Sequence, residues 1–285
     1  GENIEKIEAD NPVTLLMLDG EVYRDKRIEM TNENRELLVK NDTGDARTYS
    51  FDEVSLINPE PWRLGDGYKR FGTASLALEA ERGNSDTDEW DAALNSVWRS
   101  LEDRYTIRGA LELDEANGKK NTDNWNLLTK YDRFFKNDPT NYWGVKAKFE
   151  YDRFADLDLR TILGPHIGRQ FIDESWLQLE AEVGPVWVDE QFDVAEDDDW
   201  PGAMWIAEAE SDIIGFGTTL YVLHDGILNF DSTNDLILNT TIGVKLPLIF
   251  GFETAVEAKF EYDGGAVENV DDTDETYNFR IGYSW

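Results

Sequence analysis

Apolar and polar side chains alternate along most of this chain. In the segment GFETAVEAKFEYD, one series of alternate positions runs from Phe252 to Tyr262, and the other carries Glu253, Glu257 and Lys259. The segments YWGVKAKFEYD, LILNTTIGVKL and YTIRGALELD follow the same rule. A period of two residues is typical of a β-strand with one apolar and one charged face.

About twelve such segments occur between Phe71 and Trp285, and they predict twelve strands. The expected spans are 71–82, 89–100, 104–114, 123–135, 141–154, 157–169, 175–189, 201–211, 213–223, 235–246, 250–262 and 276–285. Most are longer than the about five or six residues of an average strand. Short connections such as LED, SD and PLIFG alternate with longer, Asp-rich ones such as EQFDVAEDDDW, although the first and fifth are short. We interpret GFG at 215–217 as small residues within a strand.

A different organisation precedes these segments. Residues 1–62 contain short alternating stretches, and Asp19-Gly20 is a hairpin signal between two of them. The segment NPEPW at 58–62 has two prolines, which is typical of a linker. The sequence therefore predicts a small all-β domain at 1–62 and a second β-domain at 63–285.

The direction of the apolar faces separates two fold classes. A soluble sandwich or lipocalin-like barrel buries them, whereas a transmembrane barrel turns them toward lipid. Aromatic residues recur eight positions apart on one face of several segments, namely Trp90 and Trp98, Trp143 and Tyr151, Phe252 and Phe260, Tyr277 and Trp285. Eight residues cover roughly 26 Å along a strand, or about 20 Å along the membrane normal at a ~40° tilt, which suits aromatic girdles at both membrane interfaces.

Strand length and strand number support the membrane class. Strands that cross a bilayer with tilt need about 9–11 residues. An even strand number with short turns on one side places both chain ends on that side. We therefore expect an antiparallel transmembrane β-barrel of about twelve strands, preceded by the small all-β domain.

In this orientation the charged faces line the interior of the barrel. Both signs are present, so ion pairs can form there. The side chains expected to face the interior are Arg108, Glu112, Lys130, Lys146, Lys148, Arg160, Glu180, Glu182, Lys245, Glu253, Glu257, Lys259 and Arg280.

The composition limits the classes of partner. Sixty Asp and Glu against 27 Lys and Arg give a net charge of −33, which disfavours nucleic acid as a partner. The chain has no cysteine and therefore no thiolate metal site. No apolar run reaches the ~18 residues of a transmembrane helix. The first residues show no signal peptide, so we expect that an export leader has already been removed.

The last nine residues, YNFRIGYSW, carry alternating aromatic side chains. This pattern resembles the C-terminal signature of bacterial outer-membrane barrels that the barrel assembly machinery recognises. The whole layout resembles the YdiY-like family of salt-induced outer-membrane proteins, a family without an established activity. The resembling stretches are LLMLDGEVYRDKRIE, YSFDEVSLI, GTASLALEAERGNSDTDEW, the closing strand and, above all, residues 127–171.

The resemblance implies a barrel in the bacterial outer membrane, in contact with its lipid and with lipopolysaccharide. It supplies no catalytic residues. The acidic excess in the loops is heavier than the family leads us to expect.

Two histidines are the only candidates for a catalytic base in a lipase-like site. His166 in GPHIGR and His224 in LHDGI lack a serine two positions later. We interpret His166 as part of an interior polar network and His224 as a strand-end residue near the membrane interface. We expect no enzyme, and an outer-membrane hydrolase is the least favoured alternative. No nucleotide or haem motif occurs, so no cofactor is expected.

Two acidic loops are candidates for loosely bound Ca²⁺ or Mg²⁺. Neither has the pattern of an EF-hand, and a solvated acidic loop is the favoured interpretation. Divalent ions that bridge these carboxylates to lipopolysaccharide phosphates are a third alternative. The candidate ligands are Asp197, Asp198, Asp199, Asp271, Asp272 and Asp274.

Two functions fit the predicted barrel. One is a structural or envelope-stress and salt-stress role with a closed or very narrow lumen, and the other is a small passive pore that prefers cations. Twelve strands leave modest room once long charged side chains fill the interior, whereas wide aqueous channels have sixteen or more strands. The closed barrel is therefore the favoured hypothesis.

Overall fold

A computed structural model of the chain describes residues 11–31, 36–40, 46–81, 87–265 and 272–285. The chain divides into two compact units, Gly1–Tyr68 and Lys69–Trp285. The first unit ends beyond the predicted linker because the short 3₁₀ helix Pro61–Leu64 and the two glycines after it belong to that unit.

The first unit is a five-stranded antiparallel sheet with the order β4-β3-β2-β1-β5. Its strands are β1 Val13–Met17, β2 Val22–Thr31, β3 Glu36–Lys40, β4 Ala46–Ser50 and β5 Val54–Ile57. Alternate apolar side chains pack into one core, with Leu15, Ile28 and Leu37 at its centre. Gly20 has a φ of +88° in the turn between β1 and β2, so the predicted hairpin at Asp19-Gly20 is confirmed.

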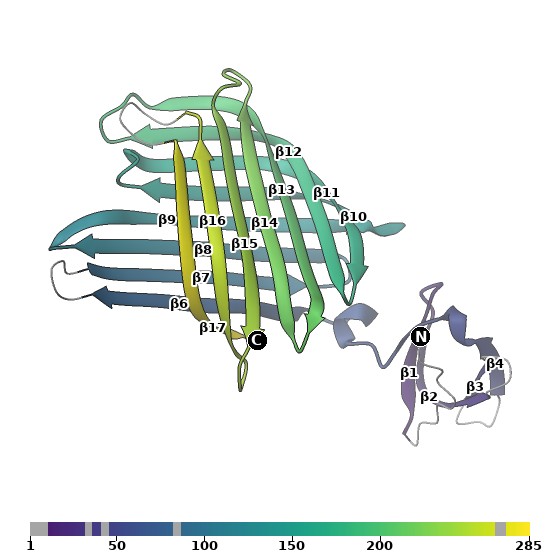
Figure 1. Ribbon diagram of the computed structural model, residues 1–285. Coiled ribbons are helices and arrows are strands. Elements are labelled where there is room, and N and C mark those ends of the chain that lie inside the picture. Colours follow the sequence, from purple (N-terminus) through teal and green to yellow (C-terminus); the bar gives the residue numbers. More distant parts are fainter. Residues whose placement is uncertain (1–10, 32–35, 41–45, 82–86, 266–271) are drawn as a thin grey trace. The chain divides into compact units, whose positions relative to one another are not determined.

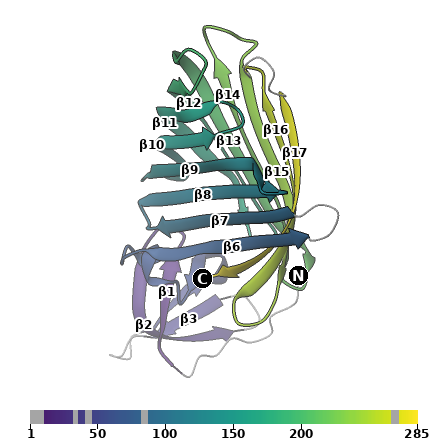
Figure 2. The same ribbon diagram turned by 90° about the vertical axis from the view of Figure 1, so that its left-hand side faces the viewer.

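The second unit is a closed barrel of twelve antiparallel strands, in which each strand pairs with the next and the last pairs with the first (Figures 1 and 2). Its strands are β6 Lys69–Glu81, β7 Thr87–Arg99, β8 Asp103–Ala116, β9 Lys119–Phe135, β10 Asp138–Asp152, β11 Leu157–Glu174, β12 Leu177–Phe192, β13 Asp198–Gly215, β14 Thr218–Asn229, β15 Leu236–Pro247, β16 Phe252–Asp263 and β17 Thr273–Ser284. The predicted fold class is confirmed.

The seam between β17 and β6 closes the barrel. Its register runs from Ile281 opposite Leu76 to Ser284 opposite Thr73, and the backbones of Gly72 and Trp285 bond to each other just beyond. Both ends of the barrel domain therefore lie on one side, which we call the chain-end side. The five connections on this side are short, at 100–102, 136–137, 175–176, 216–217 and 248–251. On the opposite side, Asn117-Gly118 is also a short turn, which the sequence did not reveal.

The connection between β13 and β14 lies at Phe216-Gly217, so the predicted turn at SD and the predicted strand 213–223 are wrong. Gly215, Phe216 and Gly217 have φ of +77°, +56° and +72°. Left-handed backbone angles at three successive residues turn the chain tightly, so no strand can continue beyond Gly215. GFG is therefore the turn itself, and β13 extends to Gly215.

The wall between β11 and β12 contains a local interruption. Register pairs are present at Leu163–Trp187 and at Ile167–Val183, and Pro165 and Pro185 lie between them. Proline has no backbone N–H, so hydrogen bonds from these two residues are missing from the ladder. Both prolines are exposed on the outer face.

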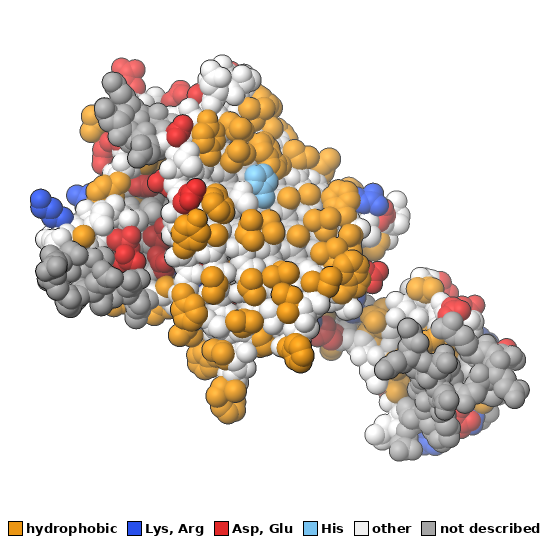
Figure 3. Space-filling view, viewed as in Figure 1, with side chains coloured by type: hydrophobic (Ala, Val, Ile, Leu, Met, Phe, Trp, Pro, Cys, Tyr) orange, Lys and Arg blue, Asp and Glu red, His pale blue; other side chains and the backbone are white. Residues whose placement is uncertain are grey.

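Large apolar side chains cover the outside of the barrel. Along β17, Tyr277, Phe279 and Ile281 are 71%, 61% and 53% exposed, whereas Arg280 between them is buried. Hydrophobic side chains cover the barrel face in Figure 3, and acidic side chains gather at its margin. An apolar exterior around a closed ladder is the arrangement that a bilayer requires. No helix within the described ranges has the length and hydropathy of a membrane span.

Candidate functional site

Ion pairs cross the interior of the barrel between strands that are not neighbours. Arg108 on β8 places Nη2 3.0 Å from Oε2 of Glu208 on β13. Lys259 on β16 places Nζ 3.2 Å from Oε1 of Glu112 on β8. Only side chains that point inward can meet across the barrel in this way, so the charged faces of these strands line the interior.

One group of these charges is fully enclosed. Glu182 on β12 receives Lys130 Nζ at 2.5 Å and Lys146 Nζ at 3.0 Å, and all three side chains are buried. Tyr142 donates its hydroxyl to the same carboxylate at 3.2 Å. A buried carboxylate needs such compensation because removing a charge from water costs several kcal/mol.

Asp132 extends this group toward β8 and β11. Its carboxylate lies 2.7 Å from Arg104 Nε and 2.7 Å from His166 Nε2. Arg104 Nη1 also donates to Glu180, at 2.9 Å. The structure thus places His166 in an interior polar network. We name the group the buried charged cluster; its members are Arg104, Lys130, Asp132, Tyr142, Lys146, His166, Glu180 and Glu182.

Glycines on β10 and β11 make room for the cluster. A Cβ on Gly144 would lie 2.6 Å from His166 Nε2, and a Cβ on Gly168 would lie 2.2 Å from the ring of Tyr142. Neither distance is compatible with a side chain larger than hydrogen. The segment GPHIGR therefore combines a buried histidine with the glycine that accommodates its aromatic neighbour.

Asp132, His166 and Glu182 are the only three described residues whose candidate metal ligands all lie within 4.8 Å of one another. The donor set nevertheless does not fit a metal ion. Three cationic side chains of the cluster already balance its three carboxylates, and Lys130 lies close to both Glu182 and Asp132. A divalent ion would have to displace that ammonium group.

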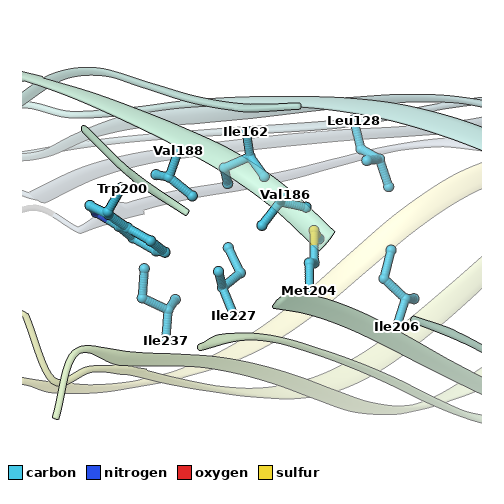
Figure 4. Close-up of a cluster of buried hydrophobic side chains, with 9 residues drawn as sticks. All are labelled: Leu128, Ile162, Val186, Val188, Trp200, Met204, Ile206, Ile227 and Ile237. Carbon is cyan, nitrogen blue, oxygen red and sulfur yellow. The ribbon is translucent and has the colours of Figure 1, made fainter. Parts of the chain in front are cut away.

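A second enclosed group is apolar. Nine buried side chains from β9 and β11–β15 point toward one another inside the barrel (Figure 4). Ile162, Val188 and Ile227 are 0% exposed. We name this group the interior apolar cluster; its members are Leu128, Ile162, Val186, Val188, Trp200, Met204, Ile206, Ile227 and Ile237.

A cavity of about 270 Å³ remains beside the interior apolar cluster, of which Leu128, Met204 and Ile206 line it. Its charged lining has an acidic excess and includes Glu112, Glu150, Glu208, Glu210, Asp225, Glu253, Glu257 and Glu261 against Arg108, Lys148, Lys245, Lys259 and Arg280. The basic groups are engaged: Lys148 Nζ lies 3.2 Å from Asp225, and Arg280 Nε lies 2.7 Å from Glu257. The cavity is therefore a polar space with net negative charge.

The family model of DUF481, described as a protein of unknown function, matches residues 74–285. The chain belongs to the DUF481 family. This result confirms the resemblance to YdiY-like proteins and covers nearly the whole barrel. The closed barrel with its apolar exterior points to the bacterial outer membrane.

Solved structures of outer-membrane barrels are similar to this DUF481 member at low identity. The NanC porin is 10% identical at a TM-score of 0.45, covering 76% of this chain and 99% of its own. The translocator domain of the autotransporter NalP from Neisseria meningitidis is 8% identical at a TM-score of 0.39, covering 78% of this chain and 88% of its own. The channel DcaP of Acinetobacter baumannii is 10% identical at a TM-score of 0.38, covering 92% of this chain and 82% of its own. TM-scores below 0.5 support no statement on function. No curated protein sequence matches the chain.

The structure distributes the predicted interior residues of this DUF481 member among three places. Lys130, Lys146, Glu180 and Glu182 belong to the buried charged cluster. Arg160 forms ion pairs with Glu190 and Asp263 at the end of the interior that lies away from the chain-end side. The remainder line the cavity: Arg108, Glu112, Lys148, Lys245, Glu253, Glu257, Lys259 and Arg280. Sequence reasoning missed Arg104 and Asp132, which share the alternating pattern of β8 and β9 and could have been included.

The predicted interface aromatics lie on the outer series of their strands. Six are exposed, namely Trp90, Trp143, Phe252, Phe260, Tyr277 and Trp285. Trp98 and Tyr151 are half-buried. Tyr151 stacks on Trp125 with ring centroids 6.2 Å apart. The girdle assignment itself stays a prediction, because the structure contains no bilayer.

His224 lies in the middle of β14, so its predicted strand-end position is wrong. The displaced turn at GFG shifted the expected strand by several residues. His224 belongs to the outer series, where it accepts from Trp205 Nε1 at 3.1 Å and contacts Thr240 Oγ1 at 2.9 Å. These two contacts satisfy both ring nitrogens on an apolar face.

The acidic-loop candidates do not converge within the described part of the chain. Asp197 accepts from the backbone N–H of Phe192, while Asp198 and Asp199 begin β13 and therefore alternate in direction. Asp272 contacts Thr273, and Asp274 lies opposite Glu261. Asp271 lies outside the described residues. Loose binding of Ca²⁺ or Mg²⁺ at these loops stays a prediction.

Proposed function

We propose that this protein is a structural outer-membrane barrel, closed or very narrow, that serves the envelope under salt stress. The interior apolar cluster is the observation that carries the proposal. An open aqueous lumen would expose these side chains to water. This exposure costs a free energy of about 25 cal/mol for each Å² of apolar surface. The salt-stress part rests only on the resemblance to the YdiY-like family, because the DUF481 family is described as of unknown function.

The buried charged cluster supports the same proposal. Its cations and carboxylates pair across the interior beside the apolar group, so long side chains occupy space that a wide pore would leave to water. No catalytic role is part of the proposal. His166 holds Asp132 through Nε2, and its Nδ1 has no hydrogen-bond partner among the described residues, so no nucleophile is bonded to it.

Planar-bilayer recording of the purified full chain tests the closed lumen. We expect no steps across salt concentration and voltage, and stable steps of appreciable conductance would overturn the proposal. A triple Val188→Ala, Met204→Ala, Ile227→Ala variant removes apolar volume from the interior and should begin to conduct. The matched control is Ile242→Ala, which removes the same kind of side chain from the exposed outer face and should stay silent.

A narrow pore that prefers cations is the second candidate, favoured by the acidic excess around the cavity. If the wild type conducts, the reversal potential measured in a salt gradient should have the sign that indicates selectivity for cations. Lys245→Gln should increase that preference, because Lys245 lines the cavity and pairs with the half-exposed Glu210 at 3.2 Å. An unchanged reversal potential would place the ion path elsewhere.

We further propose that the chain-end side faces the periplasm and that residues 1–62 lie there. The support is the set of five short connections on that side and the backbone bonds between Gly72 and Trp285. Protease added to intact cells should spare residues 1–62 and cut near 193–197. The reverse pattern would refute this topology. Contact with lipopolysaccharide and recognition of the last strand by the assembly machinery belong to the same proposal.

A further inference from the structure

An apolar groove of about 780 Å³ hollows the outer wall of the barrel over β10–β13. Its sides include the exposed side chains of Ile167, Phe171 and Val183. Ala181 on β12 and Ala207 on β13 lie opposite each other and are the small side chains of the lining, which we call the floor. The volume lies in the ~300–1,000 Å³ range of sites that hold small organic ligands.

Apart from Glu182, which belongs to the buried charged cluster, the polar residues of the lining lie at one end of the groove. That end lies at the turn between β9 and β10 on the chain-end side, where Asn137, Asp138 and Asn141 line it together with Arg169. The apolar end reaches Trp205, in the middle of β13. The lining therefore has the polarity of a lipid, with a headgroup end at the rim of the barrel and an acyl end along the wall.

Arg169 is a cation on an otherwise apolar face. It is exposed on the outer series of β11, between Ile167 and Phe171, and its guanidinium carbon lies 5.9 Å from the centroid of the Phe171 ring. The described residues contain no ion-pair partner for it within 4 Å. Arg133, which also lies on the outer series, differs because Glu102 and Asp103 neutralise it.

Asp138, the acidic group near Arg169, is already engaged. It accepts from the hydroxyl of Thr140 and from the amide of Asn141, both at 2.6 Å. Arg169 therefore retains donors for an external anion. A guanidinium forms bidentate hydrogen bonds with phosphate oxygens, and a long side chain at the edge of the apolar band extends its charge to the headgroup level.

We propose that this groove binds one phospholipid of the periplasmic leaflet, with its phosphate on Arg169 and an acyl chain over Ala181 and Ala207. The proposal rests on the outer-membrane location and on the chain-end side facing the periplasm. It does not depend on whether the interior conducts. Charge complementarity and the direction of the polar end select a phospholipid over an uncharged apolar ligand.

The test is native mass spectrometry of the delipidated full chain, titrated with phosphatidylglycerol. We expect one retained lipid per chain. Arg169→Gln should weaken retention roughly tenfold, the effect of losing a charge-assisted contact. Ala207→Phe fills the floor and should weaken it at least as much. Asp138→Asn removes a nearby negative charge and should strengthen retention.

Ala203→Phe is the matched control, since it adds the same ring to the same face of β13 outside the groove. It should retain lipid like the wild type. Equal retention by the wild type, Arg169→Gln and Ala207→Phe would overturn the proposal. Preferential retention of lipid A through Arg169 would also overturn it, since that phosphate belongs to the other leaflet.

Two further measurements separate this test from the proposals on which it depends. Heat-modifiable gel migration shows that each variant folds, and these outer-face variants should leave the bilayer recordings unchanged. Conductance in the wild type would contradict the closed-lumen proposal but would not affect the measured retention of phospholipid.

Discussion

The two enclosed groups inside the barrel fill space by opposite chemistry. The interior apolar cluster excludes water mainly with branched aliphatic side chains, which need no specific partner. The buried charged cluster fills its space with long side chains, each of which depends on another. Glu182 alone holds Lys130, Lys146 and the hydroxyl of Tyr142. Both groups close the interior, but they differ in how they respond to the loss of one residue.

That difference follows from the cost of burial. Loss of an apolar side chain costs its transfer free energy plus that of the cavity, which grows with the volume removed. Loss of one member of a buried ion pair leaves an uncompensated charge. The apolar cluster should therefore respond gradually and the charged cluster abruptly.

The largest expected effect is that of Glu182→Leu. Buried Lys146 loses its ion-pair partner and buried Lys130 keeps only Asp132, at 3.7 Å, so the free energy of unfolding should fall by about 4 kcal/mol. Denaturant titration of the refolded barrel measures it. Adding Lys146→Met should restore much of the loss, because it removes the cation left without a partner and keeps the remaining charges of the cluster balanced. A double variant no better than the single one would contradict this account.

Ile227→Ala should have the next largest effect. Ile227 is fully buried in the interior apolar cluster, and its truncation should cost about 3 kcal/mol. The same titration measures it. Ile242→Ala on the outer face provides the comparison and should cost less, because lipid or detergent replaces the lost contacts. Equal losses at the two positions would mean that the cluster is not enclosed.

Ile162→Val should have a small effect at a fully buried position. Only one methylene group is removed, so the expected cost is about 1 kcal/mol. Together with Ile227→Ala it tests whether the response scales with the removed volume. A loss as large as that of Glu182→Leu would show that the apolar cluster also responds abruptly.

The smallest expected effect is that of Lys40→Gln in the first unit. Lys40 Nζ lies 2.6 Å from Glu29 Oε1, but the side chains are 39% and 52% exposed. Solvent screens such a pair, so its loss should cost between about 0 and 1 kcal/mol and vanish at high salt. Thermal unfolding at low and high salt measures it. A large, salt-resistant loss would mean that exposure does not separate this pair from those of Glu182.

The fold was predictable because twelve strands repeat one local pattern. Alternation alone places Lys146 and Lys148 on the inner series of β10, opposite Trp143 and Val145. The connection at Phe216-Gly217 was missed because Ser211-Asp212 is the more polar dipeptide. Turn position here depends on left-handed backbone angles at two glycines and not on polarity.

The contents of the interior were less predictable. An alternating pattern predicts that the apolar residues of a strand face the lipid. It therefore does not predict apolar side chains that face the interior. In β12, Val186 and Val188 are buried inside the barrel, whereas Trp187 between them is exposed on its outside. Such a continuous apolar run is the signal of a strand with apolar side chains on both faces. Pairs such as Arg108 with Glu208, 100 positions apart, follow from the closure and register of the barrel and from no local pattern.

The short seam between β17 and β6 has a consequence for strand edges. Register pairs across it run only from Ile281 to Ser284 on β17, although that strand begins at Thr273. Along the rest of β17, every second amide faces away from β16 and has no β6 partner among the described pairings. Such an edge is the least protected part of a barrel wall. In a hydrogen-exchange experiment, these amides should exchange well before those of residues 281–284, and the first and last strands should separate from the opposite side toward the chain ends.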